Sequence, residues 1–244
     1  MMRRRLIAAA MIVMAACTSH HPATTGATTA PQASSSSNGS DLMLNVVVAV
    51  RRAGSFHLRA TSTQNGTTAV FVQEVGSRQG IQNITIGKQH ATIVVINAVA
   101  YLRANKLALL QFMGFPAAIA DRLHDRWISF TPTDAPYTDI AASVTLDSAL
   151  NEIAIDGPVT KTAETTVLGR RVVGLTGNGF MNGKETLYVP ATGTPFPVQE
   201  ILSISGGSEA IVFSHWGETV RVAKPTSVIA FSSVVRSSGE GQTA

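Results

Sequence analysis

The chain has 244 residues, of which 45% are hydrophobic and 14% charged, with a formal net charge of +4. Three of its basic residues lie among the first 16 residues, which contain no acidic residue; beyond them 19 − 3 = 16 basic residues stand against 15 acidic ones, a net charge of +1. The chain has no basic patch interleaved with aromatic residues, so a basic nucleic-acid-binding protein is excluded.

The first seventeen residues combine a basic start with a short apolar run. Arg3, Arg4 and Arg5 precede the uncharged segment 6–16, and Cys17, the only cysteine, follows directly. This pattern predicts a signal peptide over residues 1–16. The apolar run is too short to cross a bilayer, which takes about 20 residues.

Small residues before a cysteine, Ala15 and Ala16 ahead of Cys17, resemble the lipobox of bacterial lipoproteins, although Met14 stands where leucine is usual. The resemblance implies cleavage between Ala16 and Cys17, attachment of acyl chains such as palmitate to Cys17, and a lipid anchor on the extracytoplasmic (periplasmic) side of the cell membrane. The alternative is an ordinary signal peptide in which Cys17 is incidental. With Cys17 modified, no thiol remains for a disulfide, a metal ligand or a nucleophile.

Residues 17–40 are predicted to form the lipidated end and a flexible tether, because the segment is rich in Ser, Thr, Pro and Ala and has no apolar periodicity. A coil of this length has a root-mean-square reach of about 25 Å. The folded domain is expected over 41–236, followed by a disordered tail over 237–244.

The domain is expected to open with a helix capped by Asp41, although the valine-rich segment before Gly54 leaves a strand as the alternative. Next, Asn65-Gly66 separates two alternating segments, 55–64 and 67–75, which predicts a β-hairpin with a type I′ turn.

More strands are expected over 80–86, 91–97 and 98–103. The segment 92–96 is apolar on both faces after its threonine, so we expect it to be covered on both sides. The predicted cover is the apolar helical segment 105–124, which Pro116 divides into two helices. Its side chains either plug the sheet or line an apolar cavity, and the two interpretations are compatible.

The second half is expected to continue with a strand over 127–130 and helical structure over 138–153 with Thr145 as an N-cap. Six further strands, separated by glycine-containing turns, are expected over 160–168, 170–177, 184–190, 198–205, 209–214 and 219–223.

Several phrases of the sequence resemble the LppX/LprG group of actinobacterial lipoproteins, which is related in fold to the lipoprotein carrier LolA. The resemblance covers roughly residues 41–235. The phrases are Ala100-Tyr101-Leu102-Arg103, Asp125-Arg126-Trp127-Ile128, the segments 169–175 and 187–197, and Val212-Phe213-Ser214-His215-Trp216-Gly217-Glu218.

The resemblance implies an α+β fold, with one strongly curved antiparallel sheet, a half-barrel, wrapped around a few helices and enclosing an apolar cavity. It also implies binding and transfer of acylated envelope lipids or lipoglycans. The partners expected are that ligand, the membrane through the anchor, and an envelope transporter or another envelope protein. The residues predicted to line the cavity are Ile93, Val95, Leu109, Leu110, Phe112, Met113, Phe115 and Ile119.

The alternative function is a non-enzymatic sensor or scaffold that uses the same fold to bind an envelope protein, with a collapsed interior. Catalysis is not expected, because the sequence contains no Gly-x-Ser-x-Gly nucleophile elbow and its six histidines have no partners at metal-ligand spacing. We therefore predict no cofactor, no metal, and no cleft shared by a histidine and a carboxylate.

Overall fold

The computed structural model describes residues 33–142, 144–179, 183–204 and 206–234. The elements in chain order are α2 (Ala33–Ala53), β1 (Ser55–Gln64), β2 (Thr67–Gly76), β3 (Gln79–Ile86), β4 (Gln89–Ile96), β5 (Val99–Ala104), α3 (Lys106–Gln111), α4 (Ala117–Leu123), β6 (Ile128–Phe130), α5 (Tyr137–Ala142), α6 (Leu146–Ile153), β7 (Asp156–Val167), β8 (Arg170–Asn178), β9 (Lys184–Pro190), β10 (Gln199–Ile204), β11 (Gly207–Ser214) and β12 (Ile229–Ala230).

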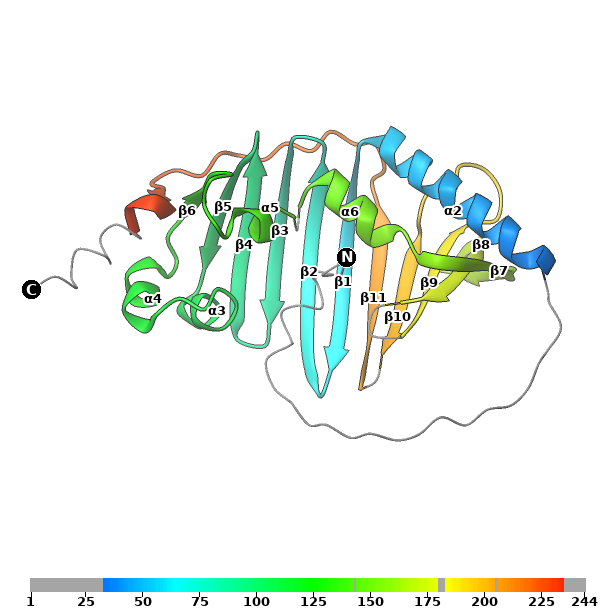
Figure 1. The fold of residues 1–244 in the computed structure, drawn as a ribbon, viewed down its shortest axis with the longest axis horizontal. Helices are drawn as coiled ribbons and strands as arrows, with labels where there is room; N and C mark the ends of the chain where they lie inside the picture. The colour runs from blue at the N-terminus through cyan, green and yellow to red at the C-terminus, as the bar shows by residue number, and fades with distance from the viewer. Residues whose placement is uncertain (1–32, 143, 180–182, 205, 235–244) are drawn as a thin grey trace, which may run out of the picture.

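The strands form one curved sheet with the order β12-β6-β5-β4-β3-β2-β1-β11-β10-β9-β8-β7 (Figure 1). Strands β1 to β6 form one antiparallel meander, and β7 to β11 form another. The two meanders meet where β1 pairs with β11, with Leu58 opposite Phe213. The predicted α+β architecture, a single curved antiparallel sheet wrapped around helices, is confirmed.

The order of the strands places the connection between the two meanders across the sheet. Strand β6 lies near one edge and β7 forms the opposite edge, so the chain between them must pass over the strands in the middle. Helices α5 and α6 belong to this connection, and α6 lies over the central strands, whereas α2 lies over β7 and its neighbours (Figure 1).

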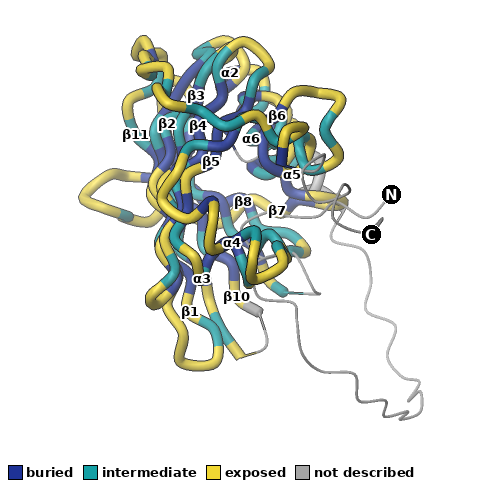
Figure 2. Tube along the Cα trace, turned by 90° about the vertical axis from the view of Figure 1, so that its left-hand side faces the viewer, coloured by how far each residue is buried: buried dark blue, intermediate teal, exposed yellow. Residues whose placement is uncertain are grey.

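The inner face of the sheet is the face that the helices cover. The residues of strand β1 show how the sequence defines this face. Phe56, Leu58 and Ala60 are buried and point toward the helices, whereas Arg59 and Thr61, which alternate with them, are exposed. Because side chains alternate along a strand, β1 has one apolar face and one wet face, as the sequence predicts. In β4 the consecutive residues Ile93, Val94 and Val95 are all buried, so the prediction that this strand is covered on both sides is confirmed. Buried segments accordingly run along the strands and exposed ones at the turns and on the outer sides of the helices (Figure 2).

The inner face carries two hydrophobic clusters. The central cluster joins α2 and α6 to β1, β2, β8, β9 and β11, with Phe56, Leu175 and Leu187 fully buried. The lateral cluster joins α3, α4 and α5 to β4, β5 and β6, with Leu109 and Phe130 fully buried. The partly buried Ile84 and Phe112 contact both clusters and connect them.

The predicted hairpin is confirmed, because Asn65 and Gly66 both have positive φ, 49° and 78°, between β1 and β2. The helix start predicted at Asp41 is wrong, since α2 begins at Ala33 and already includes part of the expected tether. This early start lets Gly39, which has no side chain, lie against the backbone of β7 near Val159.

The strand predicted over 219–223 is also wrong. This segment forms no regular secondary structure; the Gln79 side chain donates a hydrogen bond to the Val220 carbonyl oxygen at 2.6 Å, and no neighbouring strand pairs with the segment. The chain then reaches the two-residue strand β12, which the sequence analysis misses and which pairs in parallel with β6.

Helices α3 and α4 pack on the β4–β6 side of the sheet, so the prediction that segment 105–124 covers the strand over 92–96 is confirmed. The centre of the inner face is covered by α6 and α2. The signal peptide, Ala16, Cys17, the tether up to residue 32 and the tail lie outside the described residues. Within the described part of the chain, no helix is long and apolar enough to span a membrane.

Candidate functional site

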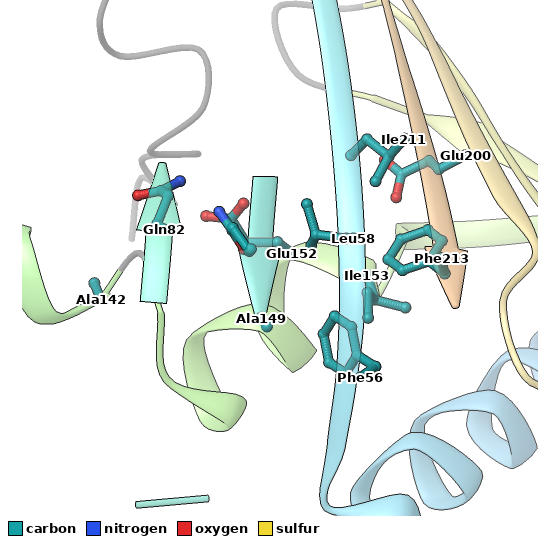
Figure 3. Close-up of a pocket in the computed structure, with 11 residues that line it drawn as sticks. Phe56, Leu58, Gln82, Ala142, Ala149, Glu152, Ile153, Glu200, Ile211 and Phe213 are labelled. Atoms are coloured by element: carbon teal, nitrogen blue, oxygen red, sulfur yellow. The ribbon is translucent and has the colours of Figure 1, made fainter. Parts of the chain in front are cut away.

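A small cavity of about 30 Å³ lies between α6 and the centre of the sheet. A buried water needs roughly 10–15 Å³ by the same kind of measure, so the cavity has room for about two waters. It is lined by Phe56, Leu58, Gln73, Gln82, Ala142, Ala149, Glu152, Ile153, Glu200, Ile211 and Phe213 (Figure 3).

The floor of the cavity consists of side chains from neighbouring strands. Gln82 of β3 pairs directly with Gln73 of β2, and Gln73 in turn pairs with Leu58 of β1. On the other side of β1, Ile211 of β11 pairs with Glu200 of β10. Gln82 and Glu200 therefore approach the cavity from opposite sides of β1 (Figure 3).

The cover of the cavity is one face of α6. Ala149, Glu152 and Ile153 are three and four residues apart, a spacing that places them on the same side of a helix. Thr145 takes the N-cap position that the sequence predicts, but its hydroxyl donates to Ser148 Oγ at 2.9 Å and makes no cap bond to the backbone.

The inner face near this cavity also holds polar side chains. Among the described residues, the buried side chains that carry charge are all glutamates, and they lie on the adjacent strands β9, β10 and β11: Glu185, Glu200 and Glu209. Gln73 and Gln82 are buried as well, with 4% and 2% exposure. Within the described part of the chain, the Gln82 side-chain oxygen Oε1 has no hydrogen-bond partner.

The sequence analysis does not identify these buried polar residues, although the alternation of residues along the strands indicates that they face inward. Glu185 is in phase with Leu187 and Val189 on β9, and Glu200 is in phase with Leu202 on β10. Residues two apart on a strand share a face, so the apolar neighbours place both carboxylates inside.

The eight residues predicted to line a cavity lie together in the lateral cluster, away from the cavity beneath α6. All of them belong to the lateral cluster or pack against it, and none lines the cavity beneath α6. Ile93, Val95 and Leu109 are buried, whereas the other five are partly buried on or beside α3 and α4.

A second concavity, an open groove of about 340 Å³, lies mainly over the outer face of β3, β4 and β5. His90 and Asp125 both line it, so the prediction that no histidine and carboxylate share a cleft is wrong. Its other polar side chains include Asn83, Thr92 and Arg103, and no bond between His90 and Asp125 is present. Within the described residues, no three acidic, histidine or cysteine side chains gather as metal ligands would.

No protein-family model matches the sequence, and no curated protein is significantly similar to it. Solved structures are similar in fold. LprF from Mycobacterium bovis matches with a TM-score of 0.54 and 14% identity, over 78% of this chain and 98% of LprF. The lipoprotein LppX from Mycobacterium tuberculosis matches with a TM-score of 0.50 and 14% identity, over 78% of this chain and all of LppX.

These similarities extend over nearly the full length of both mycobacterial proteins. At this level of identity the likeness concerns the fold alone. The expected architecture is confirmed on that basis: the chain has the fold of the mycobacterial lipoproteins LprF and LppX.

Proposed function

We propose that the chain is a lipoprotein, anchored through Cys17 on the extracytoplasmic side of the cell membrane, that binds and transfers acylated envelope lipids or lipoglycans. The observation that carries this proposal is the fold shared with LprF and LppX, in which helices lie over the apolar face of one curved sheet. The chain acts as a carrier and carries out no catalysis in this proposal.

The energetics of lipid transfer explain why such an interior is required. Each buried methylene is worth about 0.8 kcal/mol, so moving a sixteen-carbon chain from a bilayer into water costs on the order of 12 kcal/mol. A carrier has to replace nearly all of that apolar environment. The lateral cluster supplies the apolar walls in this proposal, including Ile93, Leu109 and Phe112.

Lipid binding requires the interior to open. Ligand sites usually have volumes of roughly 300–1,000 Å³, whereas the cavity beneath α6 measures about 30 Å³. We propose that α6 moves away from the sheet when a lipid enters, because α6 covers this cavity as one short helix of eight residues.

The alternative function is a sensor or scaffold that binds an envelope protein. The small volume of the cavity favours it, since a collapsed interior needs no ligand. The two functions differ in one measurable property: only the carrier holds a lipid after purification.

The test is native mass spectrometry of the chain from Thr18 onward, purified without detergent, followed by lipid extraction of the same sample. This boundary keeps α2 whole, which a start at Asp41 would cut. We expect a stoichiometric acyl lipid. A protein that stays free of lipid after incubation with envelope lipids would contradict the carrier and support the scaffold.

The anchor has its own test. Cys17→Ala removes the thiol that the lipobox resemblance assigns to acylation, so we expect the variant to leave the membrane fraction while the folded domain still binds lipid. Membrane association equal to that of the unmodified chain would contradict the lipid anchor.

A further inference from the structure

Helix α2 carries apolar side chains on two opposite sides. Met43, Val46 and Val50 are buried in the central cluster. Leu44 and Val48 face away from that cluster and are 65% and 64% exposed. These two residues are four positions apart, so they are neighbours on the helix surface. The solvent-facing side of a helix normally carries polar residues, so the exposed pair indicates a contact with another apolar surface.

Two basic residues continue the same side of α2 toward its C-terminal end. Arg51 and Arg52 follow Val48 at three and four residues and are both exposed. Neither forms an ion pair with another described residue, and α2 contains a single acidic residue, Asp41. Apolar side chains flanked by arginines are typical of helices that lie in the surface of an anionic membrane. We call the set Leu44, Val48, Arg51 and Arg52 the outer stripe of α2.

The outer stripe lies close to the proposed lipid anchor along the chain. Cys17 and Ala33, the first residue of α2, are 33 − 17 = 16 residues apart. The chain between them therefore spans at most about 55 Å, whatever its conformation. A membrane that holds Cys17 stays within this distance of α2. Docking of a tethered domain is an intramolecular step with a high effective concentration, so a contact made by few side chains is sufficient.

We propose that the outer stripe of α2 docks on the surface of the membrane that holds the anchor. Leu44 and Val48 enter the boundary between headgroups and acyl chains, and the two arginines contact anionic lipid phosphates, which guanidinium groups bind well. This inference rests on the lipid anchor proposed above. It goes beyond the anchor because it specifies which side of the folded domain faces the bilayer.

The position of α2 gives the orientation of the docked protein. Helices α2 and α6 contact each other and both pack against the central cluster, so they lie on the same face of the sheet (Figure 1). The buried side of α2 faces the sheet, and the outer stripe points away from it. Docking therefore turns the inner face, with α6, toward the bilayer, and it leaves the outer face of the sheet in water.

The experiment compares a fluorophore beside the outer stripe with one on the outer face of the sheet. The acylated full chain carries nitrobenzoxadiazole on Asn45→Cys of α2 or on Thr61→Cys of β1, both at exposed positions. Cys17 is the only natural cysteine and is acylated in this proposal, so the introduced thiol alone reacts. The chain is reconstituted into vesicles of phosphatidylcholine, alone or in equal parts with phosphatidylglycerol. We expect nitroxide-labelled lipid to quench the label at position 45 but not that at position 61.

Variants of the outer stripe separate its apolar and basic parts. Leu44→Ser combined with Val48→Ser should lower the ratio of docked to undocked chain roughly tenfold or more, because fewer apolar groups leave water. Arg51→Gln combined with Arg52→Gln should lower this ratio roughly tenfold in the anionic vesicles and leave it unchanged in phosphatidylcholine alone. Val72→Ser is the matched control, since it removes an exposed valine from the outer face of β2. Thermal melts of all variants should match that of the unmodified chain.

The outcomes distinguish docking from anchoring. Equal quenching at positions 45 and 61 in a chain that floats with the vesicles would overturn the docking proposal alone. The same holds for equal effects of the Leu44→Ser, Val48→Ser variant and Val72→Ser. A label at position 45 that becomes buried in detergent solution as the protein concentration rises would place a second copy of the chain on the stripe and also contradict membrane docking. A chain that does not float with the vesicles would overturn the lipid anchor, and the docking proposal with it.

Discussion

The two halves of the inner face differ in polarity. The central half carries Glu185, Glu200 and Glu209 buried beside Phe56 and Leu187. In the lateral half, every described buried residue of the cluster is alanine, valine, leucine, isoleucine or phenylalanine. One continuous sheet thus supports two environments, and the boundary lies at β3, where Gln82 faces the cavity and Ile84 contacts both clusters.

In the proposed carrier, this difference separates two tasks. An apolar surface holds acyl chains without selecting among them, because the hydrophobic effect is non-directional. Polar groups in an apolar pocket fix orientation and select by hydrogen bonding. The segregation of the two along one sheet is what a ligand with an apolar tail and a polar head requires.

The largest effect is expected when a carboxylate is introduced into the apolar half. Leu102 is 2% exposed in the lateral cluster, so Leu102→Glu should lower the free energy of unfolding by about 4 kcal/mol or more, because a charge is buried among apolar side chains. Urea denaturation measures the change. The control is Arg103→Glu at the exposed neighbouring position, which should change the free energy of unfolding by no more than about 0.5 kcal/mol. A Leu102→Glu variant as stable as this control would contradict the buried, apolar environment of the lateral half.

An intermediate effect is expected where the two halves meet. Phe112→Ala should cost about 2 kcal/mol, since a half-buried phenylalanine loses part of the 3–5 kcal/mol of a fully buried one. Phe112 packs against both clusters, so amide hydrogen exchange should accelerate in β1–β2 as well as in β4–β5. Phe115→Ala is the control, because Phe115 packs only against the lateral cluster; identical exchange patterns would show that Phe112 does not couple the two halves.

The smallest effect is expected for a charge on the outside of the lateral half. Lys106 of α3 and Asp121 of α4 form an ion pair with side chains that are 50% and 53% exposed. Asp121→Asn should therefore change the free energy of unfolding by less than about 1 kcal/mol, and the difference should shrink further at high salt. Thermal melts at low and high salt check this; a loss comparable to that of Leu102→Glu would mean that the pair is not solvent-screened.

The local elements could be predicted from the sequence, because their signals are short-range. Asn65-Gly66 identifies the hairpin, and the alternation around Phe56 identifies the inner face of β1. The pairing of β1 with β11 leaves no comparable local signal, since Leu58 and Phe213 are 213 − 58 = 155 residues apart. The segment 219–223 has strand-forming residues, but it forms hydrogen bonds with the Gln79 side chain and is not part of the sheet.

The site was harder to predict than the fold. The helical character of 138–153 was correctly predicted, but the position of α6 over the central strands depends on which edge β7 occupies. A local pattern carries no information on that choice. The apolar residues of α3 and α4 lie over β4, as the sequence predicts, but nothing in the sequence indicates that α6 and α2 cover the centre.

The pairing of β1 with β11 also has a consequence for the order of folding. The strands of the first meander are neighbours in the chain, so they can assemble early, but the free edge of β1 has no partner until β11, ending at Ser214, is available. Contacts between distant segments are slow to form, and an unpaired edge strand invites pairing with another chain. A chain synthesised from its N-terminus therefore exposes this edge until β11 is available, and during that interval the protein is most vulnerable to aggregation.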